Sequence, residues 1–283
     1  MAPSQLDGAS VTNVRSRNDI AGDYQEARDA GDASSMARFQ NEEACLVLLT
    51  VLEHLAADPT SFIHRVAIKG GMLMAGELRS PRVSADIDVT SGLQKRIDAE
   101  DVVREIRKAG REFGMRQSDE PERTPGGSVI HLAFDSLTDA GTAKIEVSVR
   151  ENLVFAVRDA VFNVTDLGLT PFTLPALAEV ELVSEKLRTL VQRAQPRDLF
   201  DLRLYLVDSG WHIDPASLRT CIDKKLELTK YKRWRPGLWR EHLDEIERLW
   251  SRTLQEWIDP ERIPGFKETV EEVARRLRVL KLD

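Results

Sequence analysis

The fold of this chain is decided by two short stretches, Val66-Ala67-Ile68-Lys69-Gly70-Gly71 and Val83-Ser84-Ala85-Asp86-Ile87-Asp88-Val89. In the second stretch apolar and polar residues alternate, so on a strand Asp86 and Asp88 point to the same side. Two carboxylates on one face repel each other unless a cation lies between them, and Mg²⁺ prefers such oxygen ligands. The glycine pair allows close backbone approach and offers N–H groups to an anion. Together the two stretches predict a site of phosphoryl or nucleotidyl transfer.

Each stretch alone is a weak signal. Lys-Gly-Gly is more often a tight turn, and Asp-x-Asp often arises from solvated acids at the end of a strand. Their order is more specific: an apolar strand over 66–68, the glycine pair, a short helix over 72–78, and then the strand that carries the acids. This order resembles the polymerase-β-like nucleotidyltransferases. We therefore expect an α/β (α+β) fold with a polymerase-β-like core and a mixed sheet.

A second block of charged and apolar residues follows about one hundred residues later. It reads Glu181-Leu182-Val183-Ser184-Glu185-Lys186-Leu187-Arg188, then Arg193, then Arg197-Asp198-Leu199-Phe200-Asp201-Leu202. Lys-Gly-Gly-x-Leu, Arg-x-Ser-x-Asp-x-Asp and this block, in this order, resemble the AbiEii/AbiGii toxin nucleotidyltransferases, which include the MenT-like tRNA nucleotidyltransferase toxins of type IV toxin–antitoxin systems. The resemblance covers roughly residues 46–206.

The resemblance implies a set of site residues. The catalytic residues would be Asp86, Asp88, Lys186 and Asp198, with Asp201 as an alternative to Asp198. The nucleotide-binding residues would be Lys69, Gly70, Gly71, Arg82, Ser84 and Lys186. On the residues alone, Lys186 also fits an ordinary surface charge, Asp198 fits a helix N-cap, and Arg82 and Ser84 fit polar residues at the start of a strand.

The resemblance also implies a metal site with a third acid. In this superfamily that acid comes from a strand beside the Asp-x-Asp strand, and Glu146, between apolar neighbours in the strand expected over 143–149, fits the position. Asp86, Asp88 and Glu146 would then hold Mg²⁺ or Mn²⁺ against the NTP substrate. The alternative for Glu146 is an ordinary amphipathic edge strand.

The function that the resemblance implies is that of a toxin in a bacterial toxin–antitoxin system. Such an enzyme would transfer NMP from an NTP to the 3′ end of tRNA and block translation, with a cognate antitoxin as its protein partner. A small-molecule nucleotidyltransferase of the antibiotic-modifying type and a non-catalytic nucleotide-binding interaction protein remain alternatives. A kinase is disfavoured because no Gly-Lys-Ser/Thr sequence of the Walker type follows the glycines.

Composition favours a cytoplasmic enzyme. No apolar run of the 283 residues approaches the roughly 20 residues of a membrane span, and the start of the chain has no apolar signal region. Cys45 and Cys221 lie far apart and lack Cys or His partners at metal spacing, which argues against zinc and fits a reduced chain. The net charge of −7 argues against indiscriminate binding of nucleic acid.

One basic segment stands out against this acidic background. Between residues 224 and 235 the chain carries Lys224, Lys225, Lys230, Lys232, Arg233 and Arg235, interleaved with two aromatic residues. Such a segment can hold phosphates while its rings stack on bases, so these residues are the predicted RNA-binding set. The alternative is a solvated helix face and loop, with Trp234 and Trp239 packed inward.

We expect three parts along the chain: a partly flexible N-terminal arm (1–35), a catalytic domain (36–168), and an all-helical C-terminal domain (169–283) that contributes to the cleft. Apolar spacing predicts helices over 35–57 and 98–113, strands over 128–134 and 143–149, and a polar loop over 114–127. In the C-terminal part, helices are expected from Thr173 or Pro175 toward Leu190, and over 197–207, 215–226, 239–257 and 266–279.

Overall fold

The computed structural model describes residues 16–91, 97–124, 126–149, 153–227 and 229–283. Within these residues, one mixed sheet of eight strands runs in the order β3-β5-β6-β2-β1-β8-β7, and β4 pairs with β5. The strands are β1 (Ala67–Lys69), β2 (Asp86–Thr90), β3 (Arg116–Gln117), β4 (Glu122–Thr124), β5 (Gly127–Ala133), β6 (Thr142–Ser148), β7 (Arg158–Phe162) and β8 (Phe172–Ala176).

Strand β2 lies in the middle of the sheet, where its position is fixed from both sides. It pairs antiparallel with β1 and parallel with β6. Ile87 and Val89 are fully buried on one face, so the alternation of the strand directs Asp86 and Asp88 to the other face. The acid pair of the sequence motif therefore stands on a rigid, central strand.

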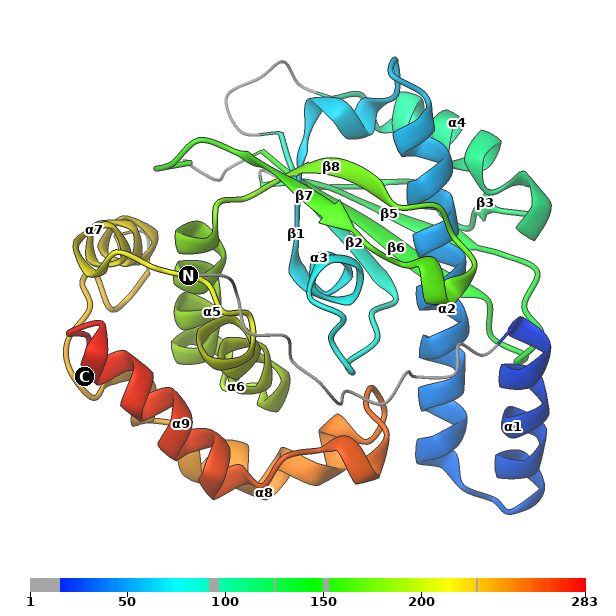
Figure 1. Cartoon of the computed structure of the whole chain (residues 1–283). Coiled ribbons are helices and arrows are strands. Elements are labelled where there is room, and N and C mark those ends of the chain that lie inside the picture. Colours follow the sequence, from blue (N-terminus) through cyan, green and yellow to red (C-terminus); the bar gives the residue numbers. More distant parts are fainter. Residues whose placement is uncertain (1–15, 92–96, 125, 150–152, 228) are drawn as a thin grey trace.

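One face of the sheet is covered by helices from the N-terminal part of the chain. Helices α2 (Ala33–Ala57) and α4 (Ala99–Ala109) pack on this face, and α1 (Arg17–Asp29) packs along α2 (Figure 1). The short helix α3 (Gly70–Glu77) connects β1 to the loop before β2 and packs against β2 and β7.

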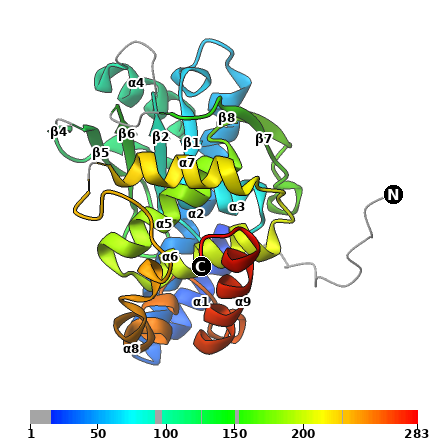
Figure 2. The same cartoon turned by 90° about the vertical axis from the view of Figure 1, so that its left-hand side faces the viewer.

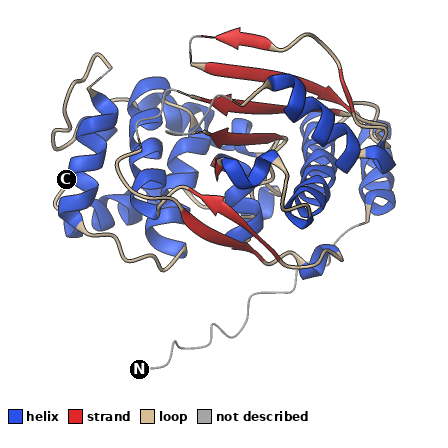
Figure 3. Cartoon of the chain, turned by 90° about the horizontal axis from the view of Figure 1, so that it is seen from above, coloured by secondary structure: helices blue, strands red, loops and turns tan. Residues whose placement is uncertain are grey.

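The C-terminal helices gather on the opposite side of the sheet (Figures 1 and 2). They are α5 (Glu179–Arg193), α6 (Pro196–Arg203) with its π-helical extension η4 (Leu204–Asp208), α7 (Pro215–Leu226), α8 (Leu243–Leu254) and α9 (Phe266–Val279). Pro196 and Pro215 occupy the first turns of α6 and α7, where a missing N–H costs nothing. Seen from above, the strands lie between the two groups of helices (Figure 3).

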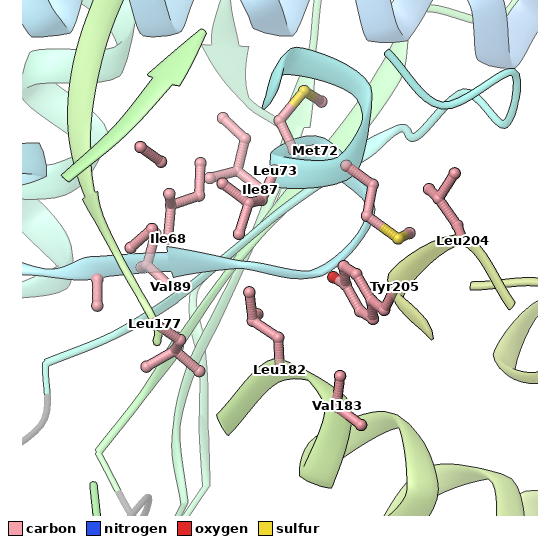
Figure 4. Close-up of a cluster of buried hydrophobic side chains, with 14 of the residues drawn as sticks. Ile68, Met72, Leu73, Ile87, Val89, Leu177, Leu182, Val183, Leu204 and Tyr205 are labelled. Atoms are coloured by element: carbon pink, nitrogen blue, oxygen red, sulfur yellow. The ribbon is translucent and has the colours of Figure 1, made fainter. Parts of the chain in front are cut away.

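The two sides of the molecule share one hydrophobic core. Figure 4 shows Ile68 and Ile87 of the sheet and Leu73 of α3 near Leu182 of α5 and Tyr205 of η4. All five side chains belong to one buried cluster that extends from α2 to the C-terminal end. Close packing of this kind resists small displacements, so the sheet and the C-terminal helices hold a fixed relation to each other.

The predicted fold class is confirmed, and most expected elements are found within a few residues of their predicted limits. One boundary was wrong: the helix expected from Thr173 or Pro175 begins at Glu179, because residues 172–176 form β8 between β1 and β7. The sheet thus extends past the predicted domain boundary at 168. The sequence also missed β7, as well as β3 and β4 within the expected loop 114–127.

The described portion of the predicted N-terminal arm is an anchored helix. A capping box between Ser16 and Asp19 starts α1, and Ile20 and Tyr24 pack against Phe39 of α2. Residues 1–15 lie outside the described residues. Among the helices of the described ranges, none is long and apolar enough to cross a membrane.

A fully buried carboxylate joins α1, α2 and the loop after β5. The side chain of Glu43 accepts hydrogen bonds from Arg17 Nη2 (2.6 Å), Ser136 Oγ (2.6 Å), Thr138 Oγ1 (2.7 Å) and Leu137 N (2.9 Å). Burial raises the pKa of Glu43, but these hydrogen bonds outweigh burial and hold the pKa below its ordinary value of 4.5. Their contribution to stability is therefore present above about pH 4.5 and is lost as the pH falls through the lower, folded-state pKa.

We expect Glu43→Ala to lower the free energy of unfolding at neutral pH by about 3–5 kcal/mol, because Arg17 and the buried donors lose their acceptor. Urea denaturation measures this loss. The matched control is Glu26→Ala, which removes an exposed carboxylate of α1 and should change stability by less than about 0.5 kcal/mol. The difference from wild type should shrink at a pH below the folded-state pKa of Glu43. Equal losses in the two variants would contradict the structural role of Glu43.

Candidate active site

The two carboxylates of β2 are half-buried and lie among charges from the neighbouring strands. The pairing register places Asp88 between Lys69 on β1 and Glu146 on β6. Asp86 pairs with Lys144 on β6, whose Nζ lies 3.4 Å from Asp86 Oδ2. The sheet thus brings the expected acids of the two strands to one neighbourhood.

The acid pair has the electrostatic character of a cation site. Burial raises the pKa of Asp86, and the nearby charge of Asp88 raises it further, while Lys144 and Arg197 act in the opposite direction. The net effect is a pKa above the ordinary value. Two carboxylates that destabilise each other's charge in a partly desolvated place would be stabilised by a divalent cation, so these residues fit the metal that the sequence implied.

Glu146 is less directly engaged than the acids of β2. Its side chain is exposed, although the register places it beside Asp88. Within the described residues, no group of three or more His, Cys, Asp or Glu side chains lies close enough together to form a metal site. The role of Glu146 as third ligand stays a prediction.

The glycine pair brings the start of α3 against β2. Gly70 has a φ of +72°, and a Cβ at this position would collide with Asp88 Oδ2. A Cβ at Gly71 would lie 2.5 Å from Ser84 Oγ and 2.6 Å from Arg82 Nη2. Both positions therefore require glycine, and the free N–H groups of the first helical turn begin next to Asp88 and Ser84.

The second motif forms a chain of alternating charges. Lys186 Nζ lies 2.6 Å from Asp201 Oδ2 and 3.5 Å from Asp198 Oδ1. Arg193 donates two hydrogen bonds of 2.7 Å to Asp198, and Arg82 Nε donates one of 2.7 Å to Asp201 Oδ1. Both aspartates are fully buried, so the order Arg82–Asp201–Lys186–Asp198–Arg193 connects the chain before β2 to α5 and α6.

This chain of charges decides between readings that the sequence left open. Asp198 is not the cap of α6: the N-cap is Gln195, and Asp198 lies in the first turn. Burial raises the pKa of Asp198, and the hydrogen bonds from Arg193 together with the charge of Lys186 lower it below its ordinary value. Lys186 is not a surface charge, because its side chain is only 13% exposed. Arg82 is 4% exposed, and its guanidinium group donates hydrogen bonds to Asp201.

Two arginines that the predicted site did not include connect the motifs. Arg197, in the first turn of α6, lowers the pKa of Asp86 by its charge, and its guanidinium lies over the ring of Trp257. The pKa of Arg193 is raised first by its hydrogen bonds to Asp198, and the charge of Asp88 adds to the rise. Both arginines belong to the second motif, but only the fold shows that the turn between α5 and α6 faces the acids of β2.

Lys69 also faces the C-terminal helices. Burial raises the pKa of Glu185 on α5, and three cations, Lys69 among them, lower it to about 2. Lys69 is the N-cap residue of α3, so its charge lies between the start of that helix and α5. Cations of β1, α5 and α6 therefore lie near the acids of β2 and Glu185, and this group of charged side chains is called the cleft below.

The structure does not support a continuous RNA-binding face over 224–235. Lys225 is buried between α5 and α7, with its Nζ 2.5 Å from Glu181 and 2.8 Å from Glu185. Trp234 and Trp239 are packed inward, as the alternative reading expected. Of the remaining cations, Arg235 pairs with Glu241 and Lys232 donates to the backbone, while Lys224, Lys230 and Arg233 are exposed.

The comparisons with known proteins agree with this geometry. The model of a family described as "Nucleotidyl transferase AbiEii toxin, Type IV TA system" matches residues 51–272, a range that contains both motifs. No curated protein matches the chain.

Three solved structures share the fold. The nucleotidyltransferase toxin MenT4 of Mycobacterium tuberculosis is 20% identical, with 94% of this chain and 90% of that chain covered and a TM-score of 0.59. JHP933 of Helicobacter pylori is 15% identical, with 83% of this chain and 88% of that chain covered and a TM-score of 0.54. A putative nucleotidyltransferase of H. pylori is 16% identical, with 83% of this chain and 91% of that chain covered and a TM-score of 0.52. At these identities, the likeness shows the fold alone.

We expect Gly70→Ala to lower the free energy of unfolding by about 2–4 kcal/mol, since it adds both a strained backbone and a collision with Asp88. Gly168→Ala is the matched control, because Gly168 has a φ of +71° with nothing within 4 Å of its Cβ position. It should cost only about 1–2 kcal/mol.

A double-mutant cycle isolates the contact between Gly70 and Asp88. Asp88→Ala removes the carboxylate that the added Cβ would meet, so it should recover part of the stability that Gly70→Ala loses. Urea denaturation of the four proteins measures the coupling. Strict additivity would show that the start of α3 does not press on Asp88.

Proposed function

Because the chain belongs to the AbiEii family of nucleotidyltransferase toxins, we propose that this enzyme transfers NMP from an NTP to the 3′ end of tRNA and so blocks translation. Membership of the family makes the chain a nucleotidyltransferase with an NTP substrate and an antitoxin partner. The tRNA acceptor and the residue roles below are the proposal. The observation that carries the residue roles is geometric: Asp86 and Asp88 share one face of β2 beside Lys144 and Lys69, and the start of α3 lies against Asp88.

The acids of β2 are the proposed holders of the divalent cation. Asp86 and Asp88 share one face of a central strand, and Glu146 on the neighbouring strand is the proposed third ligand. When bound, Mg²⁺ or Mn²⁺ neutralises charge on the α-phosphoryl group and on the leaving pyrophosphate. Cytoplasmic tRNA and NTP would be the substrates, so we place the enzyme in the cytoplasm.

The cations and N–H groups of the cleft are the proposed holders of the triphosphate. Gly70 and Gly71 present the N-terminal N–H groups of α3, and the buried hydroxyl of Ser84 lies beside them. Lys69 and Lys186 add charge from either side of the cleft. Since Lys186 is held by two buried aspartates, it is oriented before any nucleotide binds.

In the transfer itself, a terminal hydroxyl oxygen of the acceptor attacks the α-phosphorus, and the bond from that phosphorus to the β-phosphate oxygen breaks. Pyrophosphate leaves with the bonding electron pair. A carboxylate of β2 is the proposed acceptor of the hydroxyl proton. Asp198 is less suited to this role, because Arg193 already occupies both of its oxygens.

Incubation of the purified protein with total tRNA, Mg²⁺ and each α-labelled NTP in turn tests the proposal. We expect label on tRNA from one or two nucleotides, and a loss of at least about a thousandfold in Asp86→Asn and Asp88→Asn, since neutral amides hold a divalent cation poorly. Asp159→Asn, an exposed carboxylate of β7, is the control that should keep full activity.

The same assay separates the competing functions. If tRNA stays unlabelled with every NTP while small hydroxyl compounds acquire label, the enzyme is a small-molecule nucleotidyltransferase. The burial of Lys225 makes this comparison necessary, because it removes one cation from the segment that was predicted to bind RNA. Binding of NTP without any transfer would leave a nucleotide-binding interaction protein.

The metal role of Glu146 has its own test. Glu146→Gln should raise the Mg²⁺ concentration for half-maximal transfer by about tenfold or more, since a carboxylate ligand is replaced by a neutral amide. Titration of Mg²⁺ at saturating NTP measures this shift, with Asp159→Asn as the exposed-carboxylate control. An unchanged Mg²⁺ requirement would limit the ligands from this chain to Asp86 and Asp88.

A further inference from the structure

A second cationic site lies outside the cleft, between α4 and the edge strands β3 and β4. It is a cavity of about 940 Å³. Its lining contains six cations against two carboxylates, Glu100 and Glu120. The cations are Arg104, Arg107, Lys108, Arg111, Arg116 and Arg123. On a chain with a net charge of −7, this is a strong local excess of positive charge.

Half of these cations have no carboxylate partner within the described residues. Arg104 pairs with Asp101, Lys108 with Asp58, and Arg116 with Asp135. Arg107, Arg111 and Arg123, by contrast, are exposed and form no ion pair with any residue that the structure describes. Unpaired guanidinium groups around a cavity form a site for an anion that can accept forked hydrogen bonds, above all a phosphate.

The cavity is separate from the catalytic cleft. In the sheet, β6 and β5 lie between β2 and β3, so three strand spacings, about 14 Å, separate the acid pair from the edge strands. Helix α4 lies on the face of the sheet that α2 covers, opposite α5 and α6 (Figures 1 and 2). A ligand in the cavity would thus lie about 14 Å along the sheet from the acid pair and on the opposite face of the sheet.

We propose that this cavity binds the phosphate backbone of the double-helical part of the tRNA acceptor while its 3′ end lies at Asp86 and Asp88. The inference rests on the proposed function. The edge strands lie about 14 Å along the sheet from the acid pair, so an RNA helix with its end at β2 would reach the cavity by passing round this edge of the sheet. The site would therefore set the affinity for tRNA and leave the chemistry at β2 unchanged.

The lining distinguishes this ligand from the alternatives. Among the described residues it contains no aromatic side chain on which an unpaired base could stack, which favours backbone phosphates over single-stranded RNA. Its described apolar members, Val103, Met115 and Pro121, are buried or half-buried, so none of them offers an exposed anchor to a protein partner such as the antitoxin. Contacts of this type are independent of sequence, so they would not select the nucleotide or the tRNA by its bases.

The test replaces the three unpaired arginines by Arg107→Ala/Arg111→Ala/Arg123→Ala. The matched control, Arg252→Ala/Arg275→Ala/Arg278→Ala, removes three exposed arginines from α8 and α9 at the other end of the molecule. Transfer kinetics give KM for tRNA and kcat for each protein. Fluorescence anisotropy gives tRNA binding as a function of salt, and circular dichroism confirms that both variants are folded.

For the cavity variant we expect KM for tRNA to rise about ten- to one-hundredfold with kcat nearly unchanged, and the slope of log binding constant against log salt to fall by about 2–3. Transfer to a short single strand with the sequence of the tRNA 3′ end should be unaffected, because that strand has no helix to place in the cavity. The control variant should match wild type in all of these quantities.

Each other outcome has one meaning. Labelled tRNA with unchanged KM and salt slope in the cavity variant overturns the cavity site and leaves the proposed function standing. If wild type binds tRNA without labelling it, and the cavity variant loses that binding, the proposed function fails while the cavity site is supported. If the variant keeps its tRNA kinetics but escapes inhibition by the co-purified cognate antitoxin, the cavity belongs to the protein partner and the inference is wrong.

Discussion

The geometry of the cleft depends on the buried chain of charges Arg82–Asp201–Lys186–Asp198–Arg193. Two aspartates without solvent contact would be very costly if any partner were missing, because a buried unpaired charge costs several kcal/mol. The same carboxylates, both on α6, fix Arg82 from the chain before β2 and Lys186 and Arg193 from α5. Three cations against two carboxylates leave one excess positive charge on the wall that faces the acids of β2. The network thus positions these charged side chains and gives them the net positive charge that a triphosphate requires.

Such a network is better suited to positioning than to stabilisation. Replacing a buried ion pair by apolar residues often leaves stability unchanged or improved, so net stability does not account for five charges here. What apolar residues cannot provide is a fixed ammonium group, and Lys186 has its Nζ held at 2.6 Å from Asp201. Groups oriented before the reaction need no reorganisation when charge develops at phosphorus. The hydrophobic core that β2, α3 and α5 share holds this arrangement in a fixed position relative to Asp86 and Asp88.

The sequence predicted the strands and turns that local residue patterns determine, and it missed the strand pairings and ion pairs that depend on residues far away in the chain. Period-two alternation located β2, β5 and β6, and the glycine pair predicted the close approach at Asp88. Strand β8 was missed because Pro175 suggested a helix start, although its pairing with β7 decides its conformation. The partner of Arg82 was missed because nothing near it in sequence shows Asp201, 119 positions later. Lys225 was likewise grouped with its neighbours 224–235, while its partners Glu181 and Glu185 lie on another helix.

The distribution of charge explains how an acidic enzyme can act on an anionic acceptor. A chain with a net charge of −7 repels bulk nucleic acid at long range, so binding has to come from places where cations are concentrated and oriented. In the cleft, the cations are held by buried aspartates and are available to one triphosphate in one geometry. Around the cavity beside α4, Arg107, Arg111 and Arg123 are exposed and form no ion pair with any residue that the structure describes. Cations held by buried aspartates suit the reacting phosphates, and exposed cations on a separate site suit remote ones. Affinity for the acceptor can then change without disturbing the chemistry.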